Sequence, residues 1–245
     1  MSTSASFIAH LLELRTRLLH SAFALLLVFV CIFPWAGELY ALLAKPLLAK
    51  LPTGGQMIAT DVTTPFFVPL KVALMAAFLV ALPYILYQVW RFVAPGLYEH
   101  EKRLVVPLIV ASTVLFFCGM SFAYFMVFPV VFGFITAAAP QGVAVMTDID
   151  KYLSFALSMF MAFGITFQVP VAVVVLVRMG FVSVEKLRES RSYVVVVAFV
   201  VGAIFTPPDV VSQIMLAIPL WLLYETGIVV AVWMGQGKSK EIGLH

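Results

Sequence analysis

Hydrophobic residues are gathered into six runs along this chain of 245 residues. The runs cover approximately residues 18–35, 67–90, 105–131, 153–177, 193–206 and 210–234. The first four are long enough for a helix to cross a hydrocarbon core, which takes about 20 residues. The pattern predicts an all-α integral membrane protein with six transmembrane helices. We expect a single membrane domain over residues 1–235, followed by a tail of residues 236–245.

The last two runs differ from the others: the fifth is short, and the sixth meets an acidic residue partway along. The run "YVVVVAFVVGAIF" has about 13 residues, which at a helical rise of 1.5 Å span roughly 20 Å. A hydrocarbon core is about 30 Å thick. The following run extends only slightly further before it meets Glu225. We therefore expect two short helices joined at "TPPD", in a hairpin that stops below the far surface or thins the bilayer around it.

Lysine and arginine are distributed unequally between the two sides that six spans define. With the N-terminus inside, one side carries 11 of the 15 basic residues, and the other carries Lys45, Lys50, Lys71 and Lys151. Cytoplasmic loops of membrane proteins carry such an excess. The pattern predicts that both termini are cytoplasmic, and it explains the net charge of +3 without a nucleic-acid partner.

Composition agrees with a membrane location and narrows the chemistry. The chain is 63% apolar, whereas soluble domains are about 45–50% apolar. Its two cysteines lie within apolar runs, and no cysteine–histidine cluster has metal-site spacing. The tail "GQGKS" lacks the first glycine and the strand–helix context of a phosphate loop. No nucleophile–base pair lies at depth in the membrane. We therefore expect no enzyme activity, no metal and no cofactor.

The loops on the outer side carry their own pattern. In residues 36–66, apolar positions recur at helical spacing around Pro46, which predicts a short helix on the membrane surface. Residues 132–152 are mildly apolar and contain Asp148 and Asp150. We expect these two loops to pack together as a cap. Ala73, Ala77 and Ala81 form a ridge of small residues along the second span, where another helix can approach closely.

The N-terminal segment "SFIAHLLELRTRLLH" has one polar helical face, formed by His10, Glu13, Thr16, Arg17 and His20. Glu13 and Arg17 are four residues apart, in the favourable order for a helical ion pair. Arg15 falls on the apolar face, where an arginine snorkels or meets a carboxylate. Two interpretations remain open: Glu13 and Arg17 form a solvated surface pair, or this segment shares its charges with another charged segment.

That second segment is the loop "GLYEHEKRLVVP". Topology explains Lys102 and Arg103, but acidic residues contribute little to orientation, so Glu101 needs another reason. A carboxylate at a membrane surface binds a guanidinium well. Glu13 and Glu101 would then hold two arginines of a bound peptide, beside an apolar rim that begins at Phe92. The alternative is that Glu101 pairs within the chain with Arg15 or Lys102.

Few polar residues lie within the apolar runs. Gln168 and Gln213 fit interhelical hydrogen bonds, and Asp209 fits an N-cap of the last helix. Thr206, Gln213 and Gln168 would alternatively form a polar patch that docks a partner's helix. A small-molecule or ion transporter is the alternative function. It needs a polar cavity at mid-membrane, and the chain offers little for one beyond these two glutamines.

Several stretches resemble the TatC family, the multi-spanning core of the twin-arginine protein translocase. They are "HLLELRTRLL", "QMIATDVTTPFFVPLKV", "YQVWRFVAPGLYEHEKRLVVPL", "GMSFAYFMVFP" and "FVVGAIFTPPDVVSQIMLAIPLWLLYE". The resemblance runs from about residue 8 to residue 233. It implies a cupped, glove-like bundle of six helices, the last two short. It also implies a receptor for twin-arginine signal peptides that works with TatB and TatA, single-span proteins. Together they move folded proteins across the inner membrane, using the protonmotive force and no nucleotide. A homo-oligomer within a TatBC complex is expected.

The resemblance also implies roles for individual residues. Glu13 and Glu101 match the family's signal-peptide glutamates, and Phe92 and Arg15 match further positions tied to signal recognition. We add their neighbours Arg17 and Arg103 to this group. The expected transport-critical or partner-helix positions are Pro46, Gln168, Thr206, Asp209 and Gln213. At Gln168 many members of the family carry a glutamate, so this chain offers no titrating carboxylate there.

Overall fold

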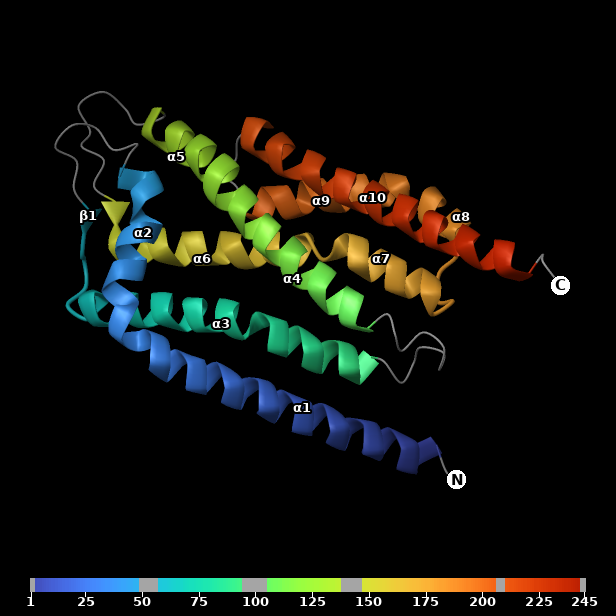
Figure 1. Ribbon diagram of the computed structural model, residues 1–245. Helices are drawn as coiled ribbons and strands as arrows, with labels where there is room; N and C mark the ends of the chain where they lie inside the picture. Colours follow the sequence, from blue (N-terminus) through green and yellow to red (C-terminus); the bar gives the residue numbers. More distant parts are fainter. Residues whose placement is uncertain (1–2, 49–56, 94–104, 138–146, 206–209, 243–245) are drawn as a thin grey trace. The chain divides into compact units, whose positions relative to one another are not determined.

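The structure, a computed structural model, describes residues 3–48, 57–93, 105–137, 147–205 and 210–242. Helices dominate these residues (Figure 1). In chain order the elements are α1 (Thr3–Ile32), η1 (Phe33–Trp35), α2 (Ala36–Leu48), β1 (Met57–Ile58), α3 (Thr64–Val93), α4 (Val105–Phe122), η4 (Ala123–Val127), α5 (Phe128–Ala137), β2 (Thr147–Asp148), α6 (Ile149–Thr166), α7 (Val169–Arg178), α8 (Val184–Glu189), α9 (Arg191–Phe205) and α10 (Val210–Ile242).

Several helical stretches are long and apolar enough to cross a membrane. Within the described residues there are five: His10–Lys45, Thr64–Phe92, Val105–Phe134, Ile149–Arg178 and Gln213–Met234. A sixth apolar helix, Arg191–Ile204, is shorter. The prediction of a helical membrane protein is therefore confirmed. The total of six transmembrane helices and the cytoplasmic location of both termini stay predictions.

Contacts divide the chain into two compact units. The first contains residues 1–48, 54–113 and 146–154, and the second contains residues 49–53, 114–145 and 155–245. Each unit is described by itself below. The single domain predicted over residues 1–235 stays a prediction.

In the first unit, α1 runs alongside α3, and α2 also packs on α3 (Figure 1). The predicted ridge of small residues on α3 is buried: Ala73 and Ala77 are 0% exposed, and Ala81 is 4% exposed. Small side chains allow neighbouring backbones to approach closely. The ridge therefore explains how α3 serves as the central helix of this unit.

The two outer loops meet within the first unit, as the sequence predicts. α2 is the expected short helix and continues through Pro46. β1 pairs with β2 in parallel, with Met57 opposite Thr147. The buried hydroxyl of Tyr152 donates a hydrogen bond to the carbonyl oxygen of Leu43, at 2.7 Å. The cap is thus confirmed for the described residues of both loops.

In the second unit, two of the long apolar helices are interrupted near prolines. The π-helical segment η4 ends just before Pro129, and α6 and α7 are separated at Phe167 and Gln168, just before Pro170. Proline has no backbone N–H to donate and its ring crowds the preceding turn, so helices kink or change their winding there. Both interruptions therefore lie next to a proline of an apolar run.

The expectation of two short final helices is wrong for the last one. α9 has 15 residues, or about 22 Å, but α10 has 33 residues and carries the apolar stretch Gln213–Met234. Glu225 does not end the helix, because its Oε2 accepts a hydrogen bond from Arg191 Nη2 at 2.7 Å. An arginine of α9 thus compensates the charge of this carboxylate within an apolar helix, although its other oxygen, Oε1, is buried without a hydrogen-bond partner among the described residues. Residues 206–209 lie outside the described residues, so the depth of the hairpin stays a prediction.

Candidate functional site

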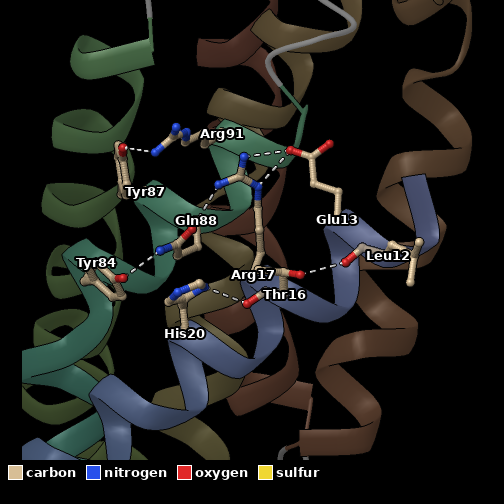
Figure 2. Close-up of a pocket in the computed structure, with 9 residues that line it drawn as sticks. All are labelled: Leu12, Glu13, Thr16, Arg17, His20, Tyr84, Tyr87, Gln88 and Arg91. Carbon is tan, nitrogen blue, oxygen red and sulfur yellow. Dashed lines mark hydrogen bonds and ion pairs between the residues drawn. The ribbon is translucent and has the colours of Figure 1, made fainter. Parts of the chain in front are cut away.

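A pocket of about 540 Å³ lies between α1 and α3 in the first unit (Figure 2). Its α1 wall consists of Leu12 and of the polar face that helical periodicity predicts, except His10. The lining residues are Leu12, Glu13, Thr16, Arg17, His20, Tyr84, Tyr87, Gln88 and Arg91. The predicted sharing of charges with the 91–103 loop stays a prediction, because residues 94–104 lie outside the described residues; the described partner of Arg17 across the pocket is the uncharged Gln88 of α3.

The α3 wall was not predicted. Tyr84, Tyr87, Gln88 and Arg91 follow one another at helical spacing, so they share one face of α3. Each is polar, although the helix is otherwise apolar over most of its length. A search for polar residues three or four positions apart near the end of an apolar run would have found them.

Glu13 and Arg17 form the charged centre of the pocket. The Nε and Nη2 atoms of Arg17 both donate to Oε1 of Glu13, at 3.1 and 2.6 Å. The Arg17 side chain is 17% exposed and the Glu13 side chain is 34% exposed. The second carboxylate oxygen of Glu13, Oε2, has no hydrogen-bond partner among the residues that the structure describes. The predicted ion pair is therefore present, with half of its acceptor unused.

Arg17 is also fixed from α3. Its Nη1 donates to Oε1 of Gln88 at 3.1 Å, and Nε2 of Gln88 donates to the Tyr84 hydroxyl at 2.7 Å. Gln88 is buried, with 7% of its surface exposed. Figure 2 shows the Arg17 guanidinium between Glu13 and Gln88. A buried amide with both ends bonded has one preferred orientation, so this contact fixes the position of the arginine.

A ring contact joins the two helices at the same end. The rings of His10 and Phe92 stack with centroids 4.3 Å apart. Within α3, the adjacent residue Arg91 donates from Nη1 to the hydroxyl of Tyr87 at 2.8 Å, and its guanidinium carbon lies 5.8 Å from that ring's centroid. Phe92 therefore lies where the predicted apolar rim begins, next to the polar pocket.

The remaining residues predicted to bind the signal peptide are Arg15, Glu101 and Arg103. Arg15 is exposed and makes no contact with a carboxylate among the described residues. Its predicted pairing with Glu101 stays open, because Glu101 and Arg103 lie outside the described residues.

Pro46, Gln168 and Gln213, the described transport-critical predictions, are not among the residues that line this pocket. Pro46 is in α2. Gln168 and Gln213 belong to the second unit, where Gln213 Nε2 donates to the carbonyl oxygen of Phe199 at 3.0 Å and Gln168 Nε2 lies 3.5 Å from the carbonyl oxygen of Gly164. Thr206 and Asp209 are outside the described residues, so the N-cap and the polar patch stay predictions.

A second polar pocket, of about 260 Å³, lies in the cap. Asp148 accepts hydrogen bonds there from the Thr60 hydroxyl and from the backbone N–H groups of Thr60, Asp150 and Lys151. These bonds, that of the Thr60 hydroxyl above all, lower the pKa of Asp148 from 3.8 to about 2. Lys71 Nζ lies 2.6 Å from Oδ1 of Asp150. Among the described residues, no group of three histidine, cysteine, aspartate or glutamate side chains is arranged to hold a metal ion.

Comparison with known proteins assigns the chain to one family. The family described as TatC, Sec-independent protein translocase protein, matches residues 9–219. The chain belongs to the TatC family. It is 53% identical to the Sec-independent protein translocase protein TatC of Escherichia coli (strain K12), over 96% of this chain and 91% of that protein. It is 41% identical to the TatC protein of Aquifex aeolicus, over 95% of this chain and 97% of that protein.

Solved structures agree with the TatC assignment. Two crystal structures described as the twin arginine translocase receptor TatC are 40% identical to this chain and cover 91% of it. Their TM-scores are 0.78 and 0.80, and the matched region spans 98% and 99% of those chains. The predictions of a protein translocase component and of a non-enzymatic chain are confirmed by membership of the TatC family.

Proposed function

We propose that this TatC protein binds signal peptides that carry two adjacent arginines, and that the first contact is made in the pocket between α1 and α3. The observation that carries the proposal is the carboxylate of Glu13. One oxygen is bonded to Arg17, and the other has no partner among the described residues. A partly exposed carboxylate oxygen beside a pocket is a ready acceptor for a guanidinium.

Besides its basic residues Arg17, His20 and Arg91, the pocket offers groups that suit a planar cation. Glu13 is the one carboxylate among the described residues that line the pocket. The rings of Tyr84 and Tyr87 stand on the opposite wall, and aromatic faces attract guanidinium groups. A hydrogen bond to a charged group contributes about 1.5–3 kcal/mol, which is enough for one arginine to decide whether a peptide binds.

We propose that Glu101 binds the second arginine of the peptide. In the sequence this residue follows the end of α3 by fewer than ten positions. Phe92, at the end of the same helix, would pack against the apolar part of the peptide. Arg15 and Arg103 would balance the charges of the two glutamates.

The wider proposal follows the family and the distribution of basic residues. The chain would lie in the inner membrane with both termini in the cytoplasm, and the Glu13 pocket would open on the cytoplasmic side. With TatB and TatA, and in several copies, it would transport folded proteins using the protonmotive force. Pro46, Gln168, Thr206, Asp209 and Gln213 are the proposed transport-critical or partner-contacting positions.

Photocrosslinking tests the binding step. A photoreactive residue placed at Phe92 should crosslink to a signal peptide with paired arginines. The additional substitution Glu13→Gln should remove the crosslink, because an amide keeps the shape but not the charge. Glu38→Gln, at an exposed glutamate of α2, is the matched control and should leave the crosslink intact. Equal crosslinking in both variants would refute the proposal.

A further inference from the structure

Four side chains of the pocket form a continuous chain of hydrogen bonds from α3 to α1. The order is Tyr84, Gln88, Arg17 and Glu13, with donor–acceptor distances of 2.7 Å, 3.1 Å and, at the carboxylate, 2.6 and 3.1 Å. The two middle members are largely buried. Glu13, at the end of this chain of hydrogen bonds, is more exposed than Arg17.

The geometry at the carboxylate is one-sided. Arg17 directs two nitrogens, Nε and Nη2, to the same oxygen, and its third bonded nitrogen, Nη1, is held by Gln88. A bidentate pair would use both oxygens of the carboxylate. Here Oε2 is left without a partner among the described residues, while the rotamer of Glu13 is restrained through Oε1.

We propose that Arg17 and Gln88 are positioning residues, which hold the Glu13 carboxylate so that Oε2 is presented to a guanidinium of the ligand. This role rests on the function proposed above and concerns how the Glu13 side chain is held before the peptide binds. A glutamate on an exposed helix face samples several rotamers, and ordering it on binding lowers the affinity. A carboxylate already restrained in the empty receptor avoids that loss.

Restraint of the carboxylate also affects specificity. A guanidinium is planar and makes directed hydrogen bonds, whereas an ammonium group is a compact charge that tolerates many directions. Misplacing Oε2 therefore weakens the binding of arginine more than that of lysine. Gln88 thus contributes to the preference for arginine, although in this proposal it does not touch the peptide.

A competing role for Arg17 predicts the opposite change in peptide affinity when Arg17 is removed. If Arg17 were an internal competitor that the peptide must displace from Glu13, removing it would tighten binding. Removing its positive charge would also, by itself, favour a cationic peptide. Both the competition for Glu13 and the change in charge would therefore raise the affinity when Arg17 is removed. A loss of affinity instead supports the positioning role.

The experiment measures the dissociation constants of two labelled peptides for the full-length protein in detergent. One peptide carries adjacent arginines and the other carries adjacent lysines at the same positions. Gln88→Leu changes no charge and should weaken binding of the arginine peptide on the order of three- to tenfold, with less than about a twofold change for the lysine peptide. Arg17→Met should weaken the arginine peptide to a similar degree.

Two milder variants guard against misfolding. Tyr84→Phe removes only the hydroxyl that holds Gln88 and should weaken the arginine peptide by less than Gln88→Leu does. Tyr193→Phe is the matched control, because Tyr193 is 75% exposed and lies on α9 in the second unit. It should change neither dissociation constant. In a Glu13→Gln background, Gln88→Leu should cause no further loss.

The outcomes separate this inference from the proposed function. If Glu13→Gln leaves the affinity for the arginine peptide unchanged, the proposed binding site itself is wrong. If Glu13→Gln weakens binding but Arg17→Met tightens it, or Gln88→Leu weakens both peptides equally or neither, the positioning role is overturned and the binding site stands.

Discussion

A charged network lies near each end of α3, and the central carboxylates of the two networks, Asp148 and Glu13, differ in how completely they are bonded. Lys71 lies in the first third of the helix and contacts the cap. Gln88 lies near the other end and lines the Glu13 pocket. At 1.5 Å per residue they are about 25 Å apart along the helix axis. Both networks belong to the first unit.

In the cap, the central carboxylate of Asp148 is satisfied within the chain, whereas Asp61 and Asp150 each accept hydrogen bonds at one oxygen. Both oxygens of Asp148 accept hydrogen bonds, and Asp150 is paired with Lys71. In the Glu13 pocket, one acceptor atom has no partner among the described residues. A carboxylate with both oxygens bonded stabilises the fold, whereas a carboxylate with an unbonded oxygen can accept a donor from a ligand. We therefore interpret Asp148 as structural and Glu13, the one carboxylate that lines the described part of the α1–α3 pocket, as the binding residue.

Filling each pocket with a tryptophan side chain should reveal the largest difference between them in peptide binding. Thr16→Trp places an indole in the α1–α3 pocket, because Thr16 is exposed and lines it. It should weaken binding of the paired-arginine peptide by more than about tenfold, through steric exclusion of a guanidinium contact. Thr63→Trp does the same to the cap pocket and should leave the peptide's dissociation constant unchanged. Loss of peptide binding in the Thr63 variant would contradict the division of roles.

Removal of the central cap carboxylate should have the converse effect. Asp148→Ala deletes the acceptor of four hydrogen bonds and should lower the Tm of the detergent-solubilised protein by a few degrees. Peptide affinity should not change, because the cap and the pocket share none of their lining residues. Thermal unfolding and peptide binding measured on the same preparation check both halves of this prediction.

The cap should also respond to acid. The pKa of Asp148 is lowered to about 2 in the folded protein from an ordinary value of 3.8. A depressed pKa means that the charged form is stabilised by folding, so this contribution is complete above about pH 4 and is lost as the pH falls towards 2. The Tm difference between wild type and Asp148→Asn should therefore be constant from pH 7 to 5 and shrink below pH 4. A difference that grows on acidification would contradict the assigned direction.

The smallest effect is expected at the edge of the cap. Tyr152→Phe removes one buried hydrogen bond, from the tyrosine hydroxyl to the carbonyl oxygen of Leu43. The loss should be about 1 kcal/mol in the free energy of unfolding, with unchanged peptide affinity. Tyr193→Phe, at an exposed tyrosine, controls for the removal of a hydroxyl and should leave the Tm unchanged.

Much of the fold could be predicted because hydrophobic runs determine helices directly. The positions of α3, α4, α6 and α9 follow from the runs, and the interruptions at Gln168 and after Phe122 follow from nearby prolines. The length of α10 could not be predicted, because Glu225 looks like the end of an apolar run. Its compensation by Arg191 joins residues 34 positions apart, and a local pattern does not contain that pairing.

The binding site could be predicted only on one side. Periodicity placed Glu13 and Arg17 on one face of α1, since both lie within two turns of the same helix. It could not supply Gln88, which contacts Arg17 across 71 residues of sequence. That contact depends on how α1 packs against α3, and packing is a tertiary property. The cap was predicted as an association of loops, but not the central role of Asp148, which depends on the strand pairing of β1 with β2.

The central claim is that Glu13 accepts a guanidinium from the ligand. Its most direct test is the dissociation constant of a paired-arginine peptide for the wild-type protein and for Glu13→Gln, with Glu38→Gln as control. We predict at least a tenfold increase for Glu13→Gln, with an unchanged Tm and an unchanged affinity in the control. Equal affinity of wild type and Glu13→Gln for that peptide would contradict the claim.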